Sequence, residues 1–297
     1  IHNVMITGLG GSGIGGTIVS ELTAQECTVP VCTNKGYDLP GYINENTLVI
    51  CSSFSGNTEE TLEAFEKAKA KNAEIACVSS GGKLIELAKA QNLNYIQLAP
   101  GDSPRAMMGY SITQLLYVLN HYGLISDGFK NELNKTASLI DELQEEIQAD
   151  AEKITNHLFG KIPIIYACDG YKGMAVRFTQ QLAENSKMLS WHNIIPEMNH
   201  NELVGWRTKN ENLAVIFFRN ETDHKRNQKR IEINSEVVSK YTSSVMEYWS
   251  KGDSMIEKTF YLINVCDHVS FNLSKRNNVI VEEIEVINYL KGELAKF

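Results

Sequence analysis

The first half of the chain alternates short apolar runs with longer segments in which apolar residues recur every three or four positions. The first pattern predicts buried strands, and the second predicts amphipathic helices. The expected strands are residues 4–7, 29–33, 49–51, 74–78 and 95–98. The expected helices are residues 17–25, 58–71, 83–90 and about 104–121. Strands that alternate with helices in this way predict a doubly wound parallel sheet of the α/β class.

The second half of the chain begins as the first does and repeats its pattern. The expected strands are residues 162–168, 213–218 and 244–248. One expected helix follows the turn at residues 169–173 and ends at about residue 188, and the others span residues 225–241, 255–273 and 281–294. The polar segment 127–159 has the apolar spacing of helices, which is typical of a connector between domains. We therefore predict an N-terminal α/β domain at residues 1–123, a helical connector at 124–159 and a C-terminal α/β domain at 160–297.

Charge and composition narrow the class of partner. The net charge is −8, so no basic excess exists to neutralise a nucleic-acid backbone. No apolar run approaches the roughly 20 residues that span a bilayer. The six cysteines are scattered without CxxC pairs, which is typical of reduced cysteines in a cytosolic protein. We expect a cytoplasmic protein whose ligand is neither nucleic acid nor membrane.

A hydroxyl-rich turn connects the third expected strand with the helix that follows it. The sequence SFSGNTEET at residues 53–61 places Ser53, Ser55 and Thr58 where the helix begins. A helix N-terminus presents unpaired N–H groups and positive potential, and Gly56 lets the backbone approach a ligand. This chemistry predicts a phosphate cradle. The alternative is an ordinary helix start that Asn57 or Ser55 caps.

A glycine loop follows the first expected strand, with the sequence GLGGSG at residues 8–13. It fits the dinucleotide fingerprint, but such a site also needs an acidic residue after the second strand, where Asn34 and Lys35 stand. The glycines more plausibly bring a second loop, with Ser12, close to a small ligand. A purely structural turn is the alternative. Both loops follow strands of one parallel sheet, so they are expected to converge.

Two further segments are unusual. Arg105 follows Pro104 at the expected start of a long helix, where a cation opposes the helix dipole unless an anion is bound nearby. An exposed Arg105 without a ligand is the alternative. Residues 184–202 gather carboxylates, amides and two histidines around Trp191 and Pro196, with no clear helical or strand period. Such a loop is more typical of a site than of a spacer.

These residues also carry a resemblance to a known family. Residues 53–61 resemble the signature of the sugar-isomerase (SIS) domain, and nearly the whole chain is similar to the bifunctional phosphoglucose/phosphomannose isomerases of the phosphoglucose isomerase superfamily. Further matches are GLGGSG at 8–13, SGG at 80–82, PR at 104–105, EN at 184–185, NHNE at 199–202 and LKG at 290–292. The resemblance implies two SIS domains with three-layer αβα, flavodoxin-like sheets joined by helices.

The resemblance implies an enzyme that interconverts glucose 6-phosphate or mannose 6-phosphate with fructose 6-phosphate through a cis-enediol(ate), without cofactor or metal. It implies that the phosphate ligands are Ser53, Ser55 and Thr58, and that the loop around Gly11 and Ser12 closes on the sugar. It also implies roles for residues outside these loops. Glu184 matches the base that moves a proton between C1 and C2, His200 the ring-opening acid/base, Arg105 the cation that steadies the enediolate, and Lys291 a further ring-opening or orienting group.

The chemistry asks for these residue types independently. A carboxylate partly withdrawn from water is basic enough to move a carbon-bound proton. An arginine stabilises charge on the enediolate oxygen without losing its own proton, and a histidine exchanges protons near neutral pH. No HxxxH, CxxC or clustered-carboxylate pattern suggests a metal.

Members of the family form dimers in which this histidine reaches the neighbouring subunit's site, so a homodimer with His200 shared across the interface is expected. Two other functions were weighed. SIS units also serve as non-catalytic phosphosugar sensors, but a sensor could lose Glu184, His200 and Arg105, and all are present. An isomerase of amino-sugar metabolism would need an ammonia-handling domain, which the sequence does not show.

Overall fold

The computed structural model describes residues 1–101 and 103–297. Its internal contacts divide the chain into two compact units, residues 1–133 and 134–297, and each is described here by itself. In the part that the structure describes, no helix combines the length and the apolar character needed to cross a membrane.

The first unit is built on a sheet in which every strand pair is parallel, in the order β2-β1-β3-β4-β5. Its strands are β1 (Asn3–Thr7), β2 (Val31–Asn34), β3 (Thr47–Ser52), β4 (Glu74–Ser79) and β5 (Asn94–Gln97). Its helices are α1 (Gly10–Leu22), α2 (Glu59–Ala70), α3 (Gly82–Ala90) and α4 (Met108–His121). The strand order reverses between β1 and β3, which is where ligands bind in such sheets.

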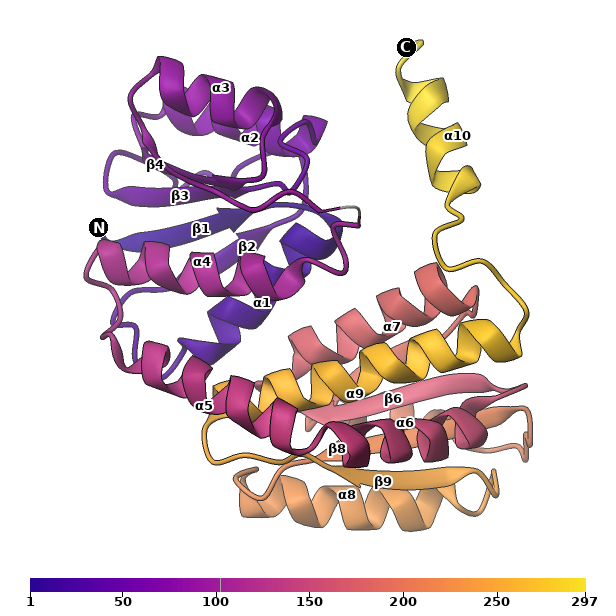
Figure 1. The fold of residues 1–297 in the computed structure, drawn as a ribbon. Coiled ribbons are helices and arrows are strands. Elements are labelled where there is room, and N and C mark those ends of the chain that lie inside the picture. The colour runs from indigo at the N-terminus through magenta and orange to yellow at the C-terminus, as the bar shows by residue number, and fades with distance from the viewer. Residues whose placement is uncertain (102) are drawn as a thin grey trace. The chain divides into compact units, whose positions relative to one another are not determined.

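Both faces of this sheet are covered by helices, as Figure 1 shows. Alternate strand residues such as Met5, Val49 and Cys77 pack on one face against Phe65 of α2 and Leu84 of α3. The residues between them face α1 and α4, which pack against each other. Central strands buried on both faces are continuously apolar, and this is why β1, β3 and β4 could be predicted from the sequence.

The second unit is organised in the same way. Its strands are β6 (Ile162–Cys168), β7 (Trp191–Ile195), β8 (Leu213–Arg219) and β9 (Val245–Trp249), all parallel and in the order β7-β6-β8-β9. Its longer helices are α6 (Gln144–Leu158), α7 (Lys172–Ser186), α8 (Lys225–Val238), α9 (Met255–Arg276) and α10 (Glu285–Leu294). This order repeats that of the first four strands of the other unit, so the chain contains one α/β design twice.

Helices also cover both faces of the second sheet (Figure 1). On one face Ile164, Tyr166 and Phe217 pack with Ile231 of α8. On the other face α9 packs against both α7 and α6. Two short 3₁₀ helices, η1 (Glu197–His200) and η2 (Glu202–Gly205), follow β7, and α5 (Gly128–Glu142) contains the boundary between the units.

The structure differs from the sequence-based expectation at several boundaries. Residues 184–202 were expected to be irregular, but 191–195 form strand β7. This strand lies at the sheet edge, where Trp191 is exposed, so it lacks the apolar run of a central strand. Helix α4 begins at Met108 and not at Pro104, because residues 104–107 form a turn. Arg105 therefore lies in a turn and not at a helix start, so the expected conflict with the helix dipole does not arise.

Helix α1 begins at Gly10, seven residues before the expected start at residue 17. The glycine loop is thus largely the first turns of a helix. A Cβ on Gly13 would lie 2.4 Å from the carbonyl oxygen of Gly8, and one on Gly16 would lie 2.8 Å from Cγ2 of Ile6. Close packing on β1 therefore outweighs the low helix propensity of glycine.

Candidate functional site

The turn between β3 and α2 gathers hydroxyl groups at the switch in strand order. Ser53 is buried, and its hydroxyl lies 2.8 Å from that of Thr58 and accepts a hydrogen bond from the N–H of Gly56 at 3.2 Å. Thr58 is the N-cap residue of α2, yet no side chain caps the helix. The alternative of an ordinary helix start capped by Asn57 or Ser55 is therefore wrong. An uncapped helix start beside hydroxyl donors is suited to an anion.

The loop after β1 lies against this turn. The hydroxyl of Ser12 accepts a hydrogen bond from the N–H of Phe54 at 3.0 Å. A Cβ on Gly11 would lie 3.2 Å from the carbonyl oxygen of Pro104 and 3.6 Å from Cα of Arg105. The first unit therefore brings Gly11, Ser12, Ser53, Thr58 and the backbone of Arg105 close together.

The β4–α3 loop supports the cradle from the other side. The hydroxyl of Ser80 donates to the carbonyl oxygen of Phe54 at 2.6 Å. Gly56 has a φ of +70°, and a Cβ there would lie 1.8 Å from the carbonyl oxygen of Gly81. The carbonyl oxygen of Ser55 also lies close to Gly82, at 2.4 Å from a Cβ built there. The hydroxyls of the cradle are thus held on a backbone that has no room for side chains at these glycines.

Two charged residues that the sequence analysis did not assign to a site lie near the cradle. Lys35 follows β2, and its Cε lies 3.8 Å from a Cβ built on Gly13. Glu59, in the first turn of α2, accepts a hydrogen bond from the hydroxyl of Tyr37, and this bond raises the pKa of Tyr37 to about 12. The carboxylate of Glu59 is therefore engaged with Tyr37. The sequence signal for Lys35 was its place after the second strand, where dinucleotide sites have an acid.

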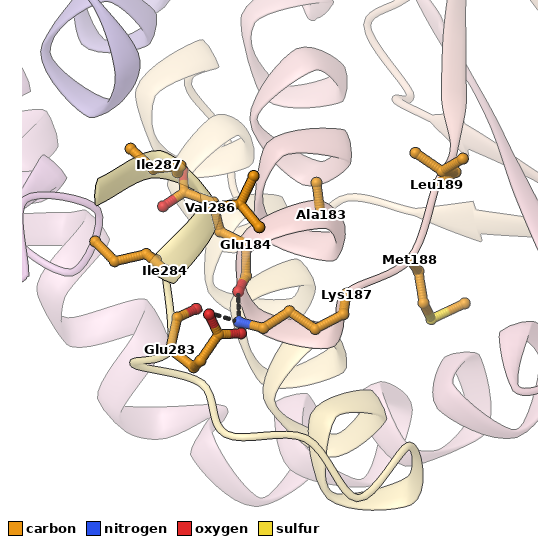
Figure 2. A pocket seen from close by; sticks show the side chains of 9 residues that line it. All are labelled: Ala183, Glu184, Lys187, Met188, Leu189, Glu283, Ile284, Val286 and Ile287. Atoms are coloured by element: carbon orange, nitrogen blue, oxygen red, sulfur yellow. Dashed lines mark hydrogen bonds between the residues drawn. The ribbon is translucent and has the colours of Figure 1, made fainter. Parts of the chain in front are cut away.

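In the second unit, Glu184 lies in the last turn of α7 and is half-buried. It lines a hollow of about 330 Å³ with neighbouring residues of α7 and with residues 283–287, as Figure 2 shows. Lys187 closes one side of this hollow. Its Nζ donates to the carbonyl oxygens of Glu184 at 2.5 Å, Glu283 at 2.7 Å and Val281 at 3.4 Å. This ammonium ties the segment before α10 to the C-terminal end of α7, which a cation also stabilises.

The other predicted residues of the second unit lie apart from this hollow. His200 is the exposed last residue of η1, and Lys291 is an exposed residue of α10. Neither lines the hollow that contains Glu184. Within the described residues, no group of three or more histidine, cysteine, aspartate or glutamate side chains is arranged to hold a metal ion.

Comparisons with known proteins find relatives that match along the whole chain. Residues 147–294 match the family described as the bacterial phospho-glucose isomerase C-terminal SIS domain. The chain is 36% identical to the bifunctional phosphoglucose/phosphomannose isomerase of Caldicellulosiruptor bescii over all of this chain and 90% of the relative. It is 28% identical to the D-glucosamine-6-phosphate 4-epimerase of Sulfolobus acidocaldarius over 94% of this chain and 85% of that protein.

A solved structure shows the same fold. The C-terminal domain of glucosamine-fructose-6-phosphate aminotransferase from Francisella tularensis superimposes with a TM-score of 0.76. The match covers 95% of this chain and 86% of that one at 13% identity, so it speaks for the SIS fold alone. The full-length similarity at 36% identity goes further. The chain therefore belongs to the bifunctional phosphoglucose/phosphomannose isomerase family and is a phosphosugar isomerase.

Proposed function

We propose that this protein interconverts glucose 6-phosphate, mannose 6-phosphate and fructose 6-phosphate by proton transfer through a cis-enediol(ate). The observation that carries the proposal is the cradle at the start of α2. There the buried hydroxyl of Ser53 and the hydroxyl of Thr58 meet beside an N-terminus that no side chain caps. This is where a 6-phosphate group finds hydrogen-bond donors and favourable potential.

Ser53, Ser55 and Thr58 bind the phosphate in this proposal, and the loop of Gly11 and Ser12 closes on the sugar. The backbone of Arg105 already lies beside Gly11. Its guanidinium stabilises the negative charge that develops on the enediolate oxygen, because a fixed cation interacts more strongly with the transition state than with the neutral substrate.

Glu184 is the proposed base that moves the proton between C1 and C2. It is half-buried in a hollow whose other lining is largely apolar, which reduces hydration of the carboxylate. His200 acts as acid and base in ring opening, and Lys291 assists it or orients the substrate. The exposed position of His200 suits a group that reaches the site of a second copy in a homodimer.

The test offers fructose 6-phosphate to the wild type and to Glu184→Gln and identifies the products by NMR in D₂O. We expect the wild type to form glucose 6-phosphate and mannose 6-phosphate, with deuterium at C2 in those turnovers in which the proton held by Glu184 exchanges with the solvent. Glu184→Gln should lower turnover by about 10²–10⁴-fold, the range of general acid–base catalysis. Glu282→Gln, a change at an exposed neighbouring carboxylate, serves as the matched control and should leave turnover unchanged.

Three other outcomes would contradict this proposal. Unchanged turnover in Glu184→Gln would remove this residue as the base. Binding of fructose 6-phosphate without any product would indicate the non-catalytic sensor. A product epimeric at C4 would indicate the reaction named for the relative from Sulfolobus acidocaldarius.

A further inference from the structure

The carboxylate of Glu202 is the centre of a hydrogen-bond network at the edge of the second sheet. Its Oε1 accepts from the hydroxyl of Tyr166 at 2.5 Å and from Nε1 of Trp191 at 3.1 Å. Its Oε2 accepts from Nδ2 of Asn193 at 2.6 Å. Hydrogen bonds to a charged acceptor are roughly twice as strong as neutral ones, so these three bonds tie Glu202 firmly to β6 and β7.

Tyr166 extends the network to the far end of the same loop. The ring of Tyr166 is fully buried, and its oxygen accepts a hydrogen bond from Nε1 of Trp206 at 3.2 Å. Burial and then the bond to Glu202 raise the pKa of Tyr166 far above its ordinary value, so the phenol keeps its proton and stays a donor. One phenol therefore holds the loop at residues 202 and 206.

The loop is also held on the other side of His200. Met198 is fully buried, and Nδ2 of Asn199 donates to Oδ1 of Asn234 in α8 at 2.6 Å. The side chain of Asn201 bridges the loop internally, because its Nδ2 donates to Glu197 at 2.8 Å and its Oδ1 accepts from the N–H of Glu202 at 2.6 Å. His200 is thus an exposed side chain on a backbone that is fixed before and after it.

We propose that Glu202 is a positioning residue, whose carboxylate anchors residues 196–206, here called the His200 loop, to β6 and β7 and thereby fixes where His200 delivers its proton. This inference rests on the proposed role of His200 in ring opening. Glu202 is the charged member of the network and serves three donors at once. Without it, Tyr166, Trp191 and Asn193 would all lose an acceptor, and a displacement of about 1 Å can cost 10²-fold in rate.

The experiment separates ring opening from proton transfer by using two substrates. Fructose 6-phosphate must be opened before C1 loses its proton. 5-Deoxyfructose 6-phosphate lacks the hydroxyl that closes the ring, so it is always open. Glu202→Gln keeps an acceptor for Tyr166 and Trp191 but places its NH₂ against the NH₂ of Asn193. We expect kcat on fructose 6-phosphate to fall by about 10–100-fold and kcat on the deoxy analogue to change by less than about 3-fold.

Four further variants complete the experiment. His200→Ala should show the same split between the substrates, whereas Glu184→Gln should lose both activities. The double variant Glu202→Gln/Asn193→Asp exchanges donor and acceptor across the 2.6 Å contact, and it should recover most of the lost activity. If Glu202→Gln does not fold, Trp191→Phe removes a single donor from a partly exposed position and should give the same split, at about 3-fold.

The remaining outcomes overturn the proposal. Equal losses on both substrates would mean that Glu202 acts only on the structure as a whole, and full activity on both would mean that it holds nothing of importance. Failure of the double variant to recover activity would mean that the carboxylate is needed at residue 202 itself and not only to hold the loop. A wild type that converts neither substrate would instead overturn the proposed function.

Discussion

The second sheet repeats the order of the first four strands of the first sheet, but the helix starts at the two switch points differ. In the first unit, β3 leads into Ser53 and Thr58, and the N-terminus of α2 has no side-chain cap. In the second unit, β8 leads into Asn220 and Asp223, and α8 is capped by Nδ1 of His224, which accepts from the N–H of Arg226 at 3.1 Å. One helix start has no side-chain cap, and the other is capped by a side chain of the chain itself.

Carboxylates of the chain itself lie at the switch point of the second sheet. Oδ2 of Asp223 accepts from the N–H of Asn220 at 2.9 Å, and Oδ1 of Asp169 accepts from Nδ2 of Asn227 at 2.8 Å. Burial raises the pKa of Asp223, and burial followed by the charge of Asp223 raises the pKa of the Cys168 thiol. Donors that would serve a phosphate are thus already occupied by carboxylates. A few side chains are therefore enough to make the same helix start uncapped in one copy of the fold and capped in the other.

The difference between the two helix starts can be removed by placing a carboxylate at the start of α2. Thr58→Asp places a carboxylate at the open N-cap of α2. Like charges in contact cost several kcal/mol, so affinity for fructose 6-phosphate should fall by more than about 100-fold. The melting temperature should stay the same or rise, because aspartate is a favourable N-cap and complements the helix dipole.

Isothermal titration with fructose 6-phosphate and with inorganic phosphate measures the loss, and thermal unfolding measures the stability. Thr222→Asp makes the matched change at an exposed residue in the β8–α8 loop and should leave both ligands bound as before. Unaltered phosphate affinity in Thr58→Asp would place the phosphate somewhere other than the start of α2.

A second change tests the backbone that shapes the cradle. Gly56 and Gly123 share a positive φ, +70° and +68°, but a Cβ at Gly56 meets the carbonyl oxygen of Gly81 at 1.8 Å, whereas one at Gly123 meets nothing within 4 Å. Gly123→Ala should cost about 1–2 kcal/mol from backbone conformation alone. Gly56→Ala adds the displacement of a neighbouring loop and should cost more than about 3 kcal/mol. Urea unfolding measures both, and equal costs would mean that the β4–α3 loop yields easily.

Much of this could be predicted from the sequence, because central parallel strands are apolar throughout and each is followed by an amphipathic helix. The contact between the hydroxyls of Ser53 and Thr58 was also predictable, since the two residues are close in the chain and lie in the turn between β3 and α2. The network around Glu202 could not be predicted. It depends on the edge strand β7, in which Trp191 is exposed and Asn193 is polar. It also depends on the buried phenol of Tyr166, which precedes Glu202 by 36 residues. These residues are far apart in the sequence and come together only because β6 and β7 pair, so the sequence alone does not reveal their contacts.

The smallest expected effect concerns the anion that the second unit carries. Burial, which outweighs the hydrogen bond from the N–H of Asn220, raises the pKa of Asp223, so the folded chain holds this proton more tightly than the unfolded chain does. The associated stability is present below the unfolded pKa and is lost as the pH rises through the folded pKa. Asp223→Asn cannot lose a proton, so it should unfold at a slightly higher urea concentration than the wild type at pH 7, and this difference should shrink as the pH falls toward 4. Glu221→Gln, an exposed change in the same loop, should show no such trend. A variant less stable than the wild type at pH 7 would mean that the hydrogen bonds from Asn220 outweigh the cost of burying the Asp223 carboxylate. The charged carboxylate would then stabilise the second unit and not destabilise it.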